Sequence, residues 1–158
     1  MLIMRRLLLI GVFLLISFTS KAQDEYVNAI GLRGGLFNGV TFKHFVTPST
    51  AIEGMLTSRW SGYQITGLME HHRDIRELDG FRWFYGYGAH IGFYEGHYVT
   101  WGNNNNYMVV GIDGIIGIEY LIPNIPISLS LDWKPYFNFM GYSGFAGDDG
   151  ALGIRYTF

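Results

Sequence analysis

The sequence contains no cysteine and has no excess of basic residues. The absence of cysteine excludes a disulfide framework, a metal site built from thiolates and a lipid anchor on an N-terminal cysteine. Without Arg5, Arg6 and Lys21, which lie in the first 22 residues, 8 of the 11 basic residues remain against 13 acidic ones. The resulting net charge of about −5 argues against a nucleic-acid partner.

The sequence also lacks an apolar run long enough to cross a membrane as a helix. Its apolar stretch near the start runs from Leu7 to Phe18, which is shorter than the ~20 residues that a transmembrane helix needs. Arg5 and Arg6 precede this stretch and Ser20-Lys21-Ala22 follows it, which gives the three parts of a secretory signal. We therefore expect residues 1–22 to be a signal peptide and residues 23–158 to form one domain.

No arrangement of residues predicts a metal or cofactor site. Adjacent residues on a strand point to opposite faces of a sheet, so His71 and His72 cannot easily share one ion. We expect His90 to be a polar residue of the interior, and His71, His72 and His97 to lie at an interface or in loops.

Oxygen ligands are the other candidates for a metal site. Asp148-Asp149 and the asparagines at 103–106 could offer such ligands to Ca²⁺, but the EF-hand spacing is absent. We expect these residues to be solvated loop tips, and we expect no cofactor.

Residues 127–139, ISLSLDWKPYFNF, alternate between apolar and polar side chains over thirteen positions. A period of two predicts a β-strand whose two faces meet different environments. Thirteen residues also exceed the usual strand length of about 5–6 residues in soluble sheets.

The same alternation recurs along the chain and predicts eight strands. In the second half it covers 81–95, 107–120 and 150–158. In the first half, turn signals at 38–39, 47–50 and 61–62 separate the strands. These first-half strands are expected near 26–37, 40–46, 51–60 and 63–72.

The bulk of the apolar face decides which way it points. A soluble barrel of the lipocalin type would turn this face inward, but an eight-stranded barrel has no room for so many rings. The rings in question are Trp133, Phe137, Phe139, Tyr85, Tyr87, Phe93 and Tyr156. The sequence therefore predicts an all-β fold, an eight-stranded antiparallel up-and-down transmembrane β-barrel with its apolar face in lipid.

Aromatic residues near the strand ends support this prediction, because a membrane barrel carries aromatic girdles at both interfaces. We expect Trp83, Tyr120 and Phe158 at the periplasmic rim, and Trp60, Tyr107 and Phe137 at the outer rim. The even strand count and the short connections place both ends of the barrel in the periplasm and residues 95–106 and 140–149 outside.

The inward face is expected to carry a balanced set of charges. Buried charges are tolerable only when they are paired, so the near-balance of signs predicts a lumen closed by salt bridges. The expected network is Arg33, Lys43, Glu53, Glu70, Arg82, Asp113, Glu119, Asp132, Lys134 and Arg155, and Arg59 is also expected to face inward. Counting residues from the expected ends of adjacent strands predicts which charges lie side by side. The four predicted pairs are Lys43–Glu53, Glu70–Arg82, Arg82–Glu119 and Asp132–Arg155.

The C-terminus resembles the assembly signal of bacterial outer-membrane barrels. It has an apolar residue at every second place, namely Leu152, Ile154, Tyr156 and Phe158. The blocks GIDGIIGIEY, IPISLSLDWKPYFN and GDDGALGIRYTF, with SKAQ near the expected cleavage site, resemble small outer-membrane barrels of Bacteroidota. The architecture is similar to the OmpA/OmpX-type eight-stranded barrels. This resemblance implies an outer-membrane location and contact with the barrel assembly machinery, and it carries over no catalytic residues.

Three functions are compatible with such a barrel. The leading hypothesis is a non-enzymatic, monomeric barrel that contacts outer-membrane lipid and lipopolysaccharide and serves envelope structure or surface interaction. A lipid-modifying enzyme of the palmitoyltransferase kind would need a hollow for hydrocarbon and a set such as His97, Ser143 and Asp148, although their spacing does not require it. A narrow passive channel is the third hypothesis, and the width of the barrel argues against it.

Overall fold

A computed structural model describes residues 26–95, 106–141 and 143–158 of the chain. The expected signal peptide, residues 1–22, lies outside the described residues, as do His97 and nearly all of the expected outer loop 95–106. No helix among the described residues is long and apolar enough to cross a membrane.

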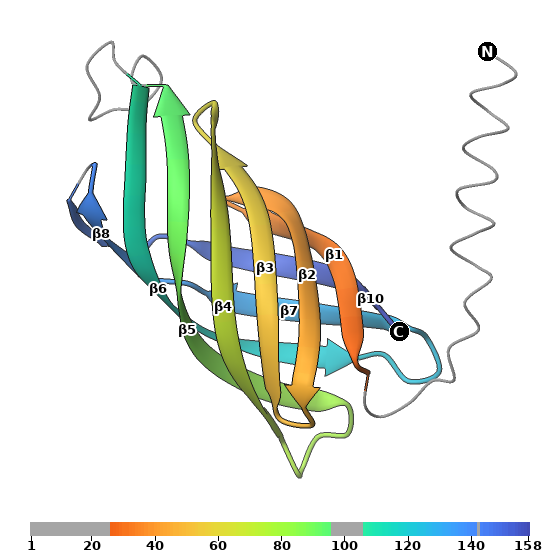
Figure 1. The fold of residues 1–158 in the computed structure, drawn as a ribbon. Helices are drawn as coiled ribbons and strands as arrows, with labels where there is room; N and C mark the ends of the chain where they lie inside the picture. Colours follow the sequence, from red (N-terminus) through yellow and green to blue (C-terminus); the bar gives the residue numbers. More distant parts are fainter. Residues whose placement is uncertain (1–25, 96–105, 142) are drawn as a thin grey trace, which may run out of the picture.

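The chain folds into antiparallel strands that follow one another around a barrel (Figure 1). The strands are β1 (Asn28–Gly35), β2 (Asn38–Thr47), β3 (Thr50–Arg59), β4 (Gly62–Asp74), β5 (Phe81–Glu95), β6 (Asn106–Leu121), β7 (Ile127–Trp133), β8 (Tyr136–Met140), β9 (Gly144–Ala146) and β10 (Gly150–Thr157). β7 and β8 together form the seventh stave of the wall, and β9 and β10 form the eighth. The prediction of an eight-stranded antiparallel up-and-down barrel is confirmed.

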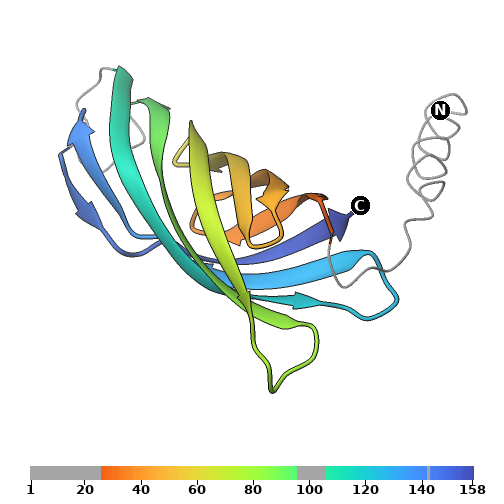
Figure 2. The ribbon, with the colours of Figure 1, turned by 60° about the horizontal axis from the view of Figure 1, so that its bottom comes forward.

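Pairing between the first and last staves closes the barrel. β1 pairs with β10, from Ala29 opposite Thr157 to Gly35 opposite Ala151, and β5 pairs with β6 over the full length of both strands. Figure 2 shows the resulting curvature of the sheet. We call the end where Asn28 and Phe158 exchange backbone hydrogen bonds the terminal end, and the end with the turn at Trp60 and Ser61 the opposite end.

Two of the turns differ in detail from the sequence-based expectation. Asn38 and Gly39 were expected to form a turn, but both belong to β2, and the turn lies at 36–37. The Asn38 Oδ1 accepts a hydrogen bond of 3.0 Å from the Gly35 amide, so this asparagine closes the turn from inside the strand. Trp60 and Ser61 both have positive φ, at 52° and 57°, which fits the two-residue hairpin turn that matches the twist of the flanking strands.

The thirteen-residue alternating stretch is interrupted at Pro135, which has no amide hydrogen for the ladder. β7 pairs with β6 up to Trp133 opposite Ile116, and pairing resumes where Tyr136 stands opposite Asp113. The alternation of faces survives the interruption: Asp132, Lys134 and Tyr136 are buried, whereas Trp133 and Phe137 are exposed. In the seventh stave, side chains therefore continue to alternate between the interior and the outer surface across both β7 and β8.

The barrel has an apolar outer surface and a largely polar interior. Large apolar side chains on every stave are exposed, and examples from five strands are Leu32, Phe42, Ile65, Ile112 and Leu131, each at least 47% exposed. Such a distribution is the reverse of a soluble protein, which keeps large contiguous apolar patches off its surface.

The interior also holds apolar clusters that the alternation of the sequence did not predict. Tyr26, Ala29, Phe45 and Ala51 pack together at the terminal end. A second cluster, Met55, Leu68, Phe84 and Ile115, packs further along the lumen. Because inward-facing residues of several strands meet in each cluster, these side chains fill space that salt bridges alone would leave open.

Candidate functional site: the ionic lumen

The ten charged residues of the expected network are buried, with exposed fractions of 6% or less, whereas Arg59, also expected to face inward, is partly exposed. The ten are Arg33, Lys43, Glu53, Glu70, Arg82, Asp113, Glu119, Asp132, Lys134 and Arg155. Strand alternation explains their burial, since each shares the inward parity of its strand. Arg82 lies 3.7 Å from Asp74 Oδ1, and the ion pairs of the other residues fall into two clusters, one toward each end of the barrel.

The first cluster is centred on Arg155 and lies toward the terminal end. The Arg155 guanidinium is 2.6 Å from Glu53 Oε1 and donates to Thr41 Oγ1 at 3.0 Å and to Ser130 Oγ at 2.7 Å. Lys43 lies 3.6 Å from Glu53 Oε2. We call this group, with the residues of the next paragraph, the Arg155 cluster.

Lys43 links this group to a second set of acids. Its ammonium is 2.7 Å from Glu70 Oε2, and the same oxygen lies 3.0 Å from His72 Nε2. His72 Nδ1 is 3.8 Å from Glu119 Oε2, and the Tyr26 hydroxyl donates to Glu119 Oε1 at 2.9 Å. The Arg155 cluster thus reaches from Ser130 on β7, across the lumen, to Tyr26 at the terminal end.

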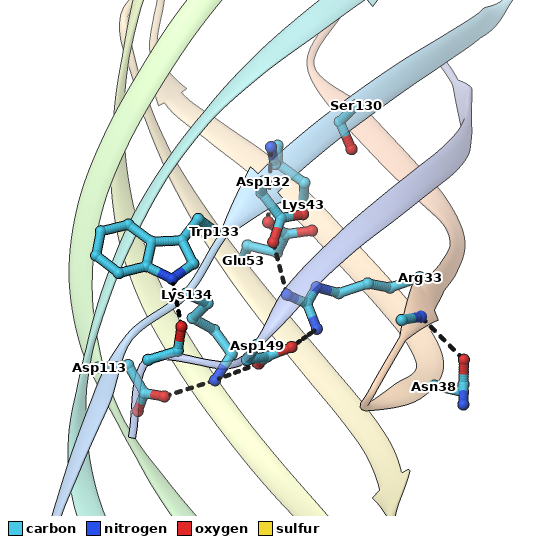
Figure 3. A network of polar contacts seen from close by, with 12 residues as sticks. Arg33, Asn38, Lys43, Glu53, Asp113, Ser130, Asp132, Trp133, Lys134 and Asp149 are labelled. Carbon is cyan, nitrogen blue, oxygen red and sulfur yellow. Dashed lines mark hydrogen bonds and ion pairs between the residues drawn. The ribbon is translucent and has the colours of Figure 1, made fainter. Parts of the chain in front are cut away.

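The second cluster is centred on Arg33 and lies toward the opposite end (Figure 3). The Arg33 guanidinium binds Asp132 Oδ1 at 2.6 Å and Asp149 Oδ1 at 2.9 Å. Lys134 is 3.2 Å from the other oxygen of Asp149 and 2.7 Å from Asp113 Oδ1. Each contact joins a different pair of staves, so the cluster ties β1, β6 and the last two staves together.

A histidine and an amide complete this Arg33 cluster. His90 Nδ1 lies 2.7 Å from Asp113 Oδ2, and His90 Nε2 lies 2.8 Å from the side-chain amide of Asn138. The pairing is of the kind that makes buried charges tolerable, because each carboxylate meets a cation or a hydrogen-bond donor.

Glycines on the inward face give the large polar side chains their room. A Cβ atom at Gly111 would lie 2.5 Å from His90 Cε1 and 2.5 Å from the backbone oxygen of Phe137. One at Gly31 would overlap the backbone of β10 and lie 2.7 Å from Arg155 Cγ. The high glycine content therefore has a steric role at these positions, since bulky interior residues need small neighbours in so narrow a barrel.

Two of the four expected neighbouring pairs are wrong. Glu70 stands opposite Gly86 on β5 and not opposite Arg82, whose partner in register is Asp74. The turn between β4 and β5 sets this register. Counting from the expected strand ends gave a register between these two strands that is wrong by four residues.

Asp132 was expected near Arg155, but its ion-pair partner is Arg33, while Arg155 turns toward Glu53. Asp132 stands opposite Ala151 and Arg155 opposite Ser128, four positions apart on adjacent strands. Lys43 does stand opposite Glu53, and Arg82 opposite Glu119. The network consequently spans two levels of the lumen and is not one ring at the terminal end.

Two residues of the clusters were assigned elsewhere from the sequence. His72 was expected at an interface, but it is 4% exposed inside the barrel. His72 follows Glu70 by two positions, so both side chains point to the same face of the strand. This spacing could have predicted that His72 faces the lumen.

Asp149 was expected to be a solvated loop tip, and it is fully buried. It follows an irregular stretch between β9 and β10, where alternation gives no guidance. Its neighbour Asp148 is exposed and pairs with Arg59 at 3.1 Å.

The expected girdle residues lie on the outer surface with one exception. Trp60, Trp83 and Phe137 are at least 36% exposed, and Tyr120 is partly exposed on the outward parity of β6. Tyr107, however, stands opposite Tyr94. Since Tyr94 is buried inside the barrel, Tyr107 belongs to the inward-facing set of β6, and its assignment to the lipid-facing girdle is wrong.

The C-terminal alternation lies entirely on the outer face. Leu152, Ile154 and Phe158 are exposed, and Tyr156 is partly exposed and stacks on Phe158 with ring centroids 5.9 Å apart. The Phe158 amide and carbonyl both bond to Asn28 at 2.8 Å, so the last residue joins the first strand.

The residues considered for catalysis do not form a site among the described residues. Ser143 is exposed, Asp148 is paired with Arg59, and His97 lies outside the described part of the chain. Within 26–95, 106–141 and 143–158, no group of three His, Asp or Glu side chains could hold a metal ion.

Solved β-barrel structures share this architecture. The N-terminal β-barrel domain of Pseudomonas aeruginosa OprF superposes with a TM-score of 0.69 at 11% identity, covering 85% of this chain and 98% of that one. Neisserial surface protein A, NspA, superposes with a TM-score of 0.53 at 11% identity, covering 88% of this chain and 100% of the other. No protein-family model and no curated protein matches the chain. At this identity the likeness establishes an OmpA/OmpX-like barrel fold.

Proposed function

We propose that this protein is a non-enzymatic outer-membrane β-barrel whose lumen is closed by the two ionic clusters, and that it serves envelope structure or surface interaction. The observation that carries the proposal is the inverted distribution of polarity. Apolar side chains cover the outside of every stave, and paired charges lie inside with no exposure of the side chains of Arg33, Asp132 and Asp149. Lipid is the environment in which an apolar exterior is stable, and a closed barrel leaves no backbone group unpaired there.

The proposal includes several finer points that rest on the sequence. Residues 1–22 act as a secretory signal, the terminal end faces the periplasm, and the C-terminal Leu152–Phe158 pattern is read by the barrel assembly machinery. The mature chain, 23–158, is a monomer in contact with outer-membrane lipid and lipopolysaccharide. The sequence blocks that resemble barrels of Bacteroidota support an origin in that group.

Cell fractionation tests the location. The full chain is produced in Gram-negative cells, and inner and outer membranes are separated on a sucrose density gradient. We expect the folded form, recognised by its heat-modifiable gel mobility, in the outer-membrane fraction. Recovery of folded protein in the periplasmic soluble fraction would overturn the proposal.

A lipid assay tests the non-enzymatic part. Purified, refolded barrel is incubated with lipid A and phospholipid, and acyl transfer is followed by mass spectrometry. No acylated product is expected, because buried ion pairs and packed apolar side chains occupy the described lumen. Turnover of lipid A would instead establish the palmitoyltransferase alternative.

A further inference from the structure

The Arg33 cluster contains more carboxylates than permanent cations. Asp113, Asp132 and Asp149 supply three acids, whereas Arg33 and Lys134 supply two positive charges (Figure 3). The side chains of these five residues are at most 2% exposed. A buried charge without compensation is costly, so the cluster needs one further positive charge.

Arg59 lies at the same end of the barrel but does not supply this charge. Its guanidinium is 3.1 Å from Asp148 Oδ2, and this fourth carboxylate balances it. The third positive charge of the Arg33 cluster must therefore come from another group that touches it.

His90 is 3% exposed and is placed to supply that charge. Its Nδ1 lies 2.7 Å from Asp113 Oδ2, and its Nε2 lies 2.8 Å from Asn138 Oδ1. Carboxylate and amide oxygens accept hydrogen bonds, so both ring nitrogens face acceptors. A neutral imidazole has one N–H and donates once, whereas an imidazolium donates twice. The geometry therefore favours the protonated ring.

The other groups around His90 are compatible with a charge there. Thr66 on β4 stands opposite it in register, and the ring of Tyr136 on β8 meets it edge-on at 5.5 Å between centroids. Neither a threonine nor a tyrosine is charged near neutral pH. Lys134 is 2.7 Å from the second oxygen of Asp113, so this carboxylate lies between Lys134 and the His90 ring.

His72 is also buried in the lumen, but its surroundings differ. Its Nε2 lies 3.0 Å from Glu70 Oε2, and Lys43 is 2.7 Å from the same oxygen. Its Nδ1 has no hydrogen-bond partner among the described residues, since Glu119 Oε2 at 3.8 Å is too far to accept one. One acceptor requires one N–H, so these contacts favour a neutral ring with its proton on Nε2.

We propose that His90 is a proton-binding site whose imidazolium form supplies the third positive charge of the Arg33 cluster, so that closure of this end of the lumen depends on pH. The neutral ring keeps its proton on Nδ1 toward Asp113, and the bound proton sits on Nε2 toward Asn138. Because the folded barrel holds this proton, rising pH removes a compensating charge and weakens the cluster. The site goes beyond the proposed function, which requires only that the lumen is closed.

The first test is a ¹⁵N NMR spectrum of the histidine rings in the refolded barrel, recorded in phosphocholine micelles at pH 7. An unpaired histidine is mostly neutral at this pH. The two ring nitrogens of His90 are expected to resonate close together, as in an imidazolium. Those of His72 are expected to be widely separated, as in a neutral ring protonated on Nε2, so one spectrum contains both the test and its internal comparison.

The second test is urea unfolding from lipid bilayers between pH 6 and pH 9. His90→Gln removes the charge and keeps a polar side chain. The unfolding equilibrium constant of the wild type is expected to rise with pH more steeply than that of this variant, by up to tenfold per pH unit, the limit for one proton. His44→Gln, at an exposed site on β2, is the matched control and should keep the wild-type slope.

A neutral ring at His90 in the wild-type spectrum would overturn the proposal without any variant, and it would mean that the Asn138 amide nitrogen donates to Nε2. Equal pH slopes for the wild type and folded His90→Gln would also overturn it. Neither result would bear on the outer-membrane location, which fractionation tests separately.

Discussion

Lys43 on β2 lies between two acids on the next two strands: its ammonium is 3.6 Å from Glu53 on β3 and 2.7 Å from Glu70 on β4. Lys43 and Glu53 are direct partners in register, whereas Glu70 approaches from one stave further round the lumen. One cation therefore compensates two buried carboxylates, and three adjacent staves depend on it.

Loss of this cation should be costly. Lys43→Met leaves Glu53 and Glu70 with less compensation, and we expect it to lower the free energy of unfolding by ~3–5 kcal/mol. The double variant with Glu70→Gln should lose less than the sum of the two single variants, since it removes both charges. Urea unfolding from lipid bilayers measures the cycle. Arg73→Met, at an exposed site on β4, is the control and should change the free energy of unfolding by less than about 0.5 kcal/mol. Additive effects of Lys43→Met and Glu70→Gln would refute the pairing.

Glycine substitutions should separate packed positions from open ones. Gly111→Ala places a methyl group against His90 and the Phe137 carbonyl, so we expect a loss of ~1–3 kcal/mol from overpacking. Gly54→Ala is the matched control on the outer face of β3, because apart from its two chain neighbours no residue has an atom within 4 Å of the place that its Cβ would take. Equal unfolding free energies for the two variants would contradict the described packing of the lumen.

The C-terminal residue should matter more for assembly than for stability. Phe158→Ala keeps the two backbone bonds to Asn28 and removes a ring that is 42% exposed. We expect a several-fold lower yield of heat-modifiable, folded barrel in membranes, with little change in the unfolding of barrels already folded. Wild-type yields of the variant would remove the support that the C-terminus gives to an assembly signal.

The barrel should not conduct ions. The side chains of Glu53, Glu70 and Arg155 are fully shielded from water, and the Arg33 cluster lies above them. Purified protein inserted in planar lipid bilayers is therefore expected to give no stepwise currents at neutral pH and moderate salt. Reproducible single-channel steps would contradict a closed lumen and favour the passive-channel hypothesis.

The alternation of apolar and polar residues predicted most of the fold. Most of the errors concern the register between neighbouring strands. Parity alone places Lys43, Glu119 and Arg155 inside, because a strand with one apolar face fixes the direction of every side chain. Which charges meet depends on the stagger between strands, and turns set that stagger. Glu70 and Arg82 illustrate the difference, since both are inside but four positions apart in register.

Irregular segments explain the remaining omissions in the candidate site. Asp149 is held in place by its backbone carbonyl, which accepts a hydrogen bond of 2.8 Å from the Lys134 amide, in a stretch without alternation. The break at Pro135 separates β8 from β7. A period of two contains no information about such breaks, so the alternation predicted one continuous strand over 127–139 where the structure has two.

The central claim is that the apolar face of each stave meets lipid. The absence of cysteine allows a single spin label to be placed at Leu131, which is 59% exposed on the outer face of β7, with a second protein labelled at Glu77 in the β4–β5 turn as the aqueous control. Accessibility to molecular oxygen and to a water-soluble nickel complex is then measured in bilayers. We predict that oxygen reaches the label at Leu131 far better than nickel does, with the reverse at Glu77. Equal nickel access at both positions would contradict a lipid-facing exterior.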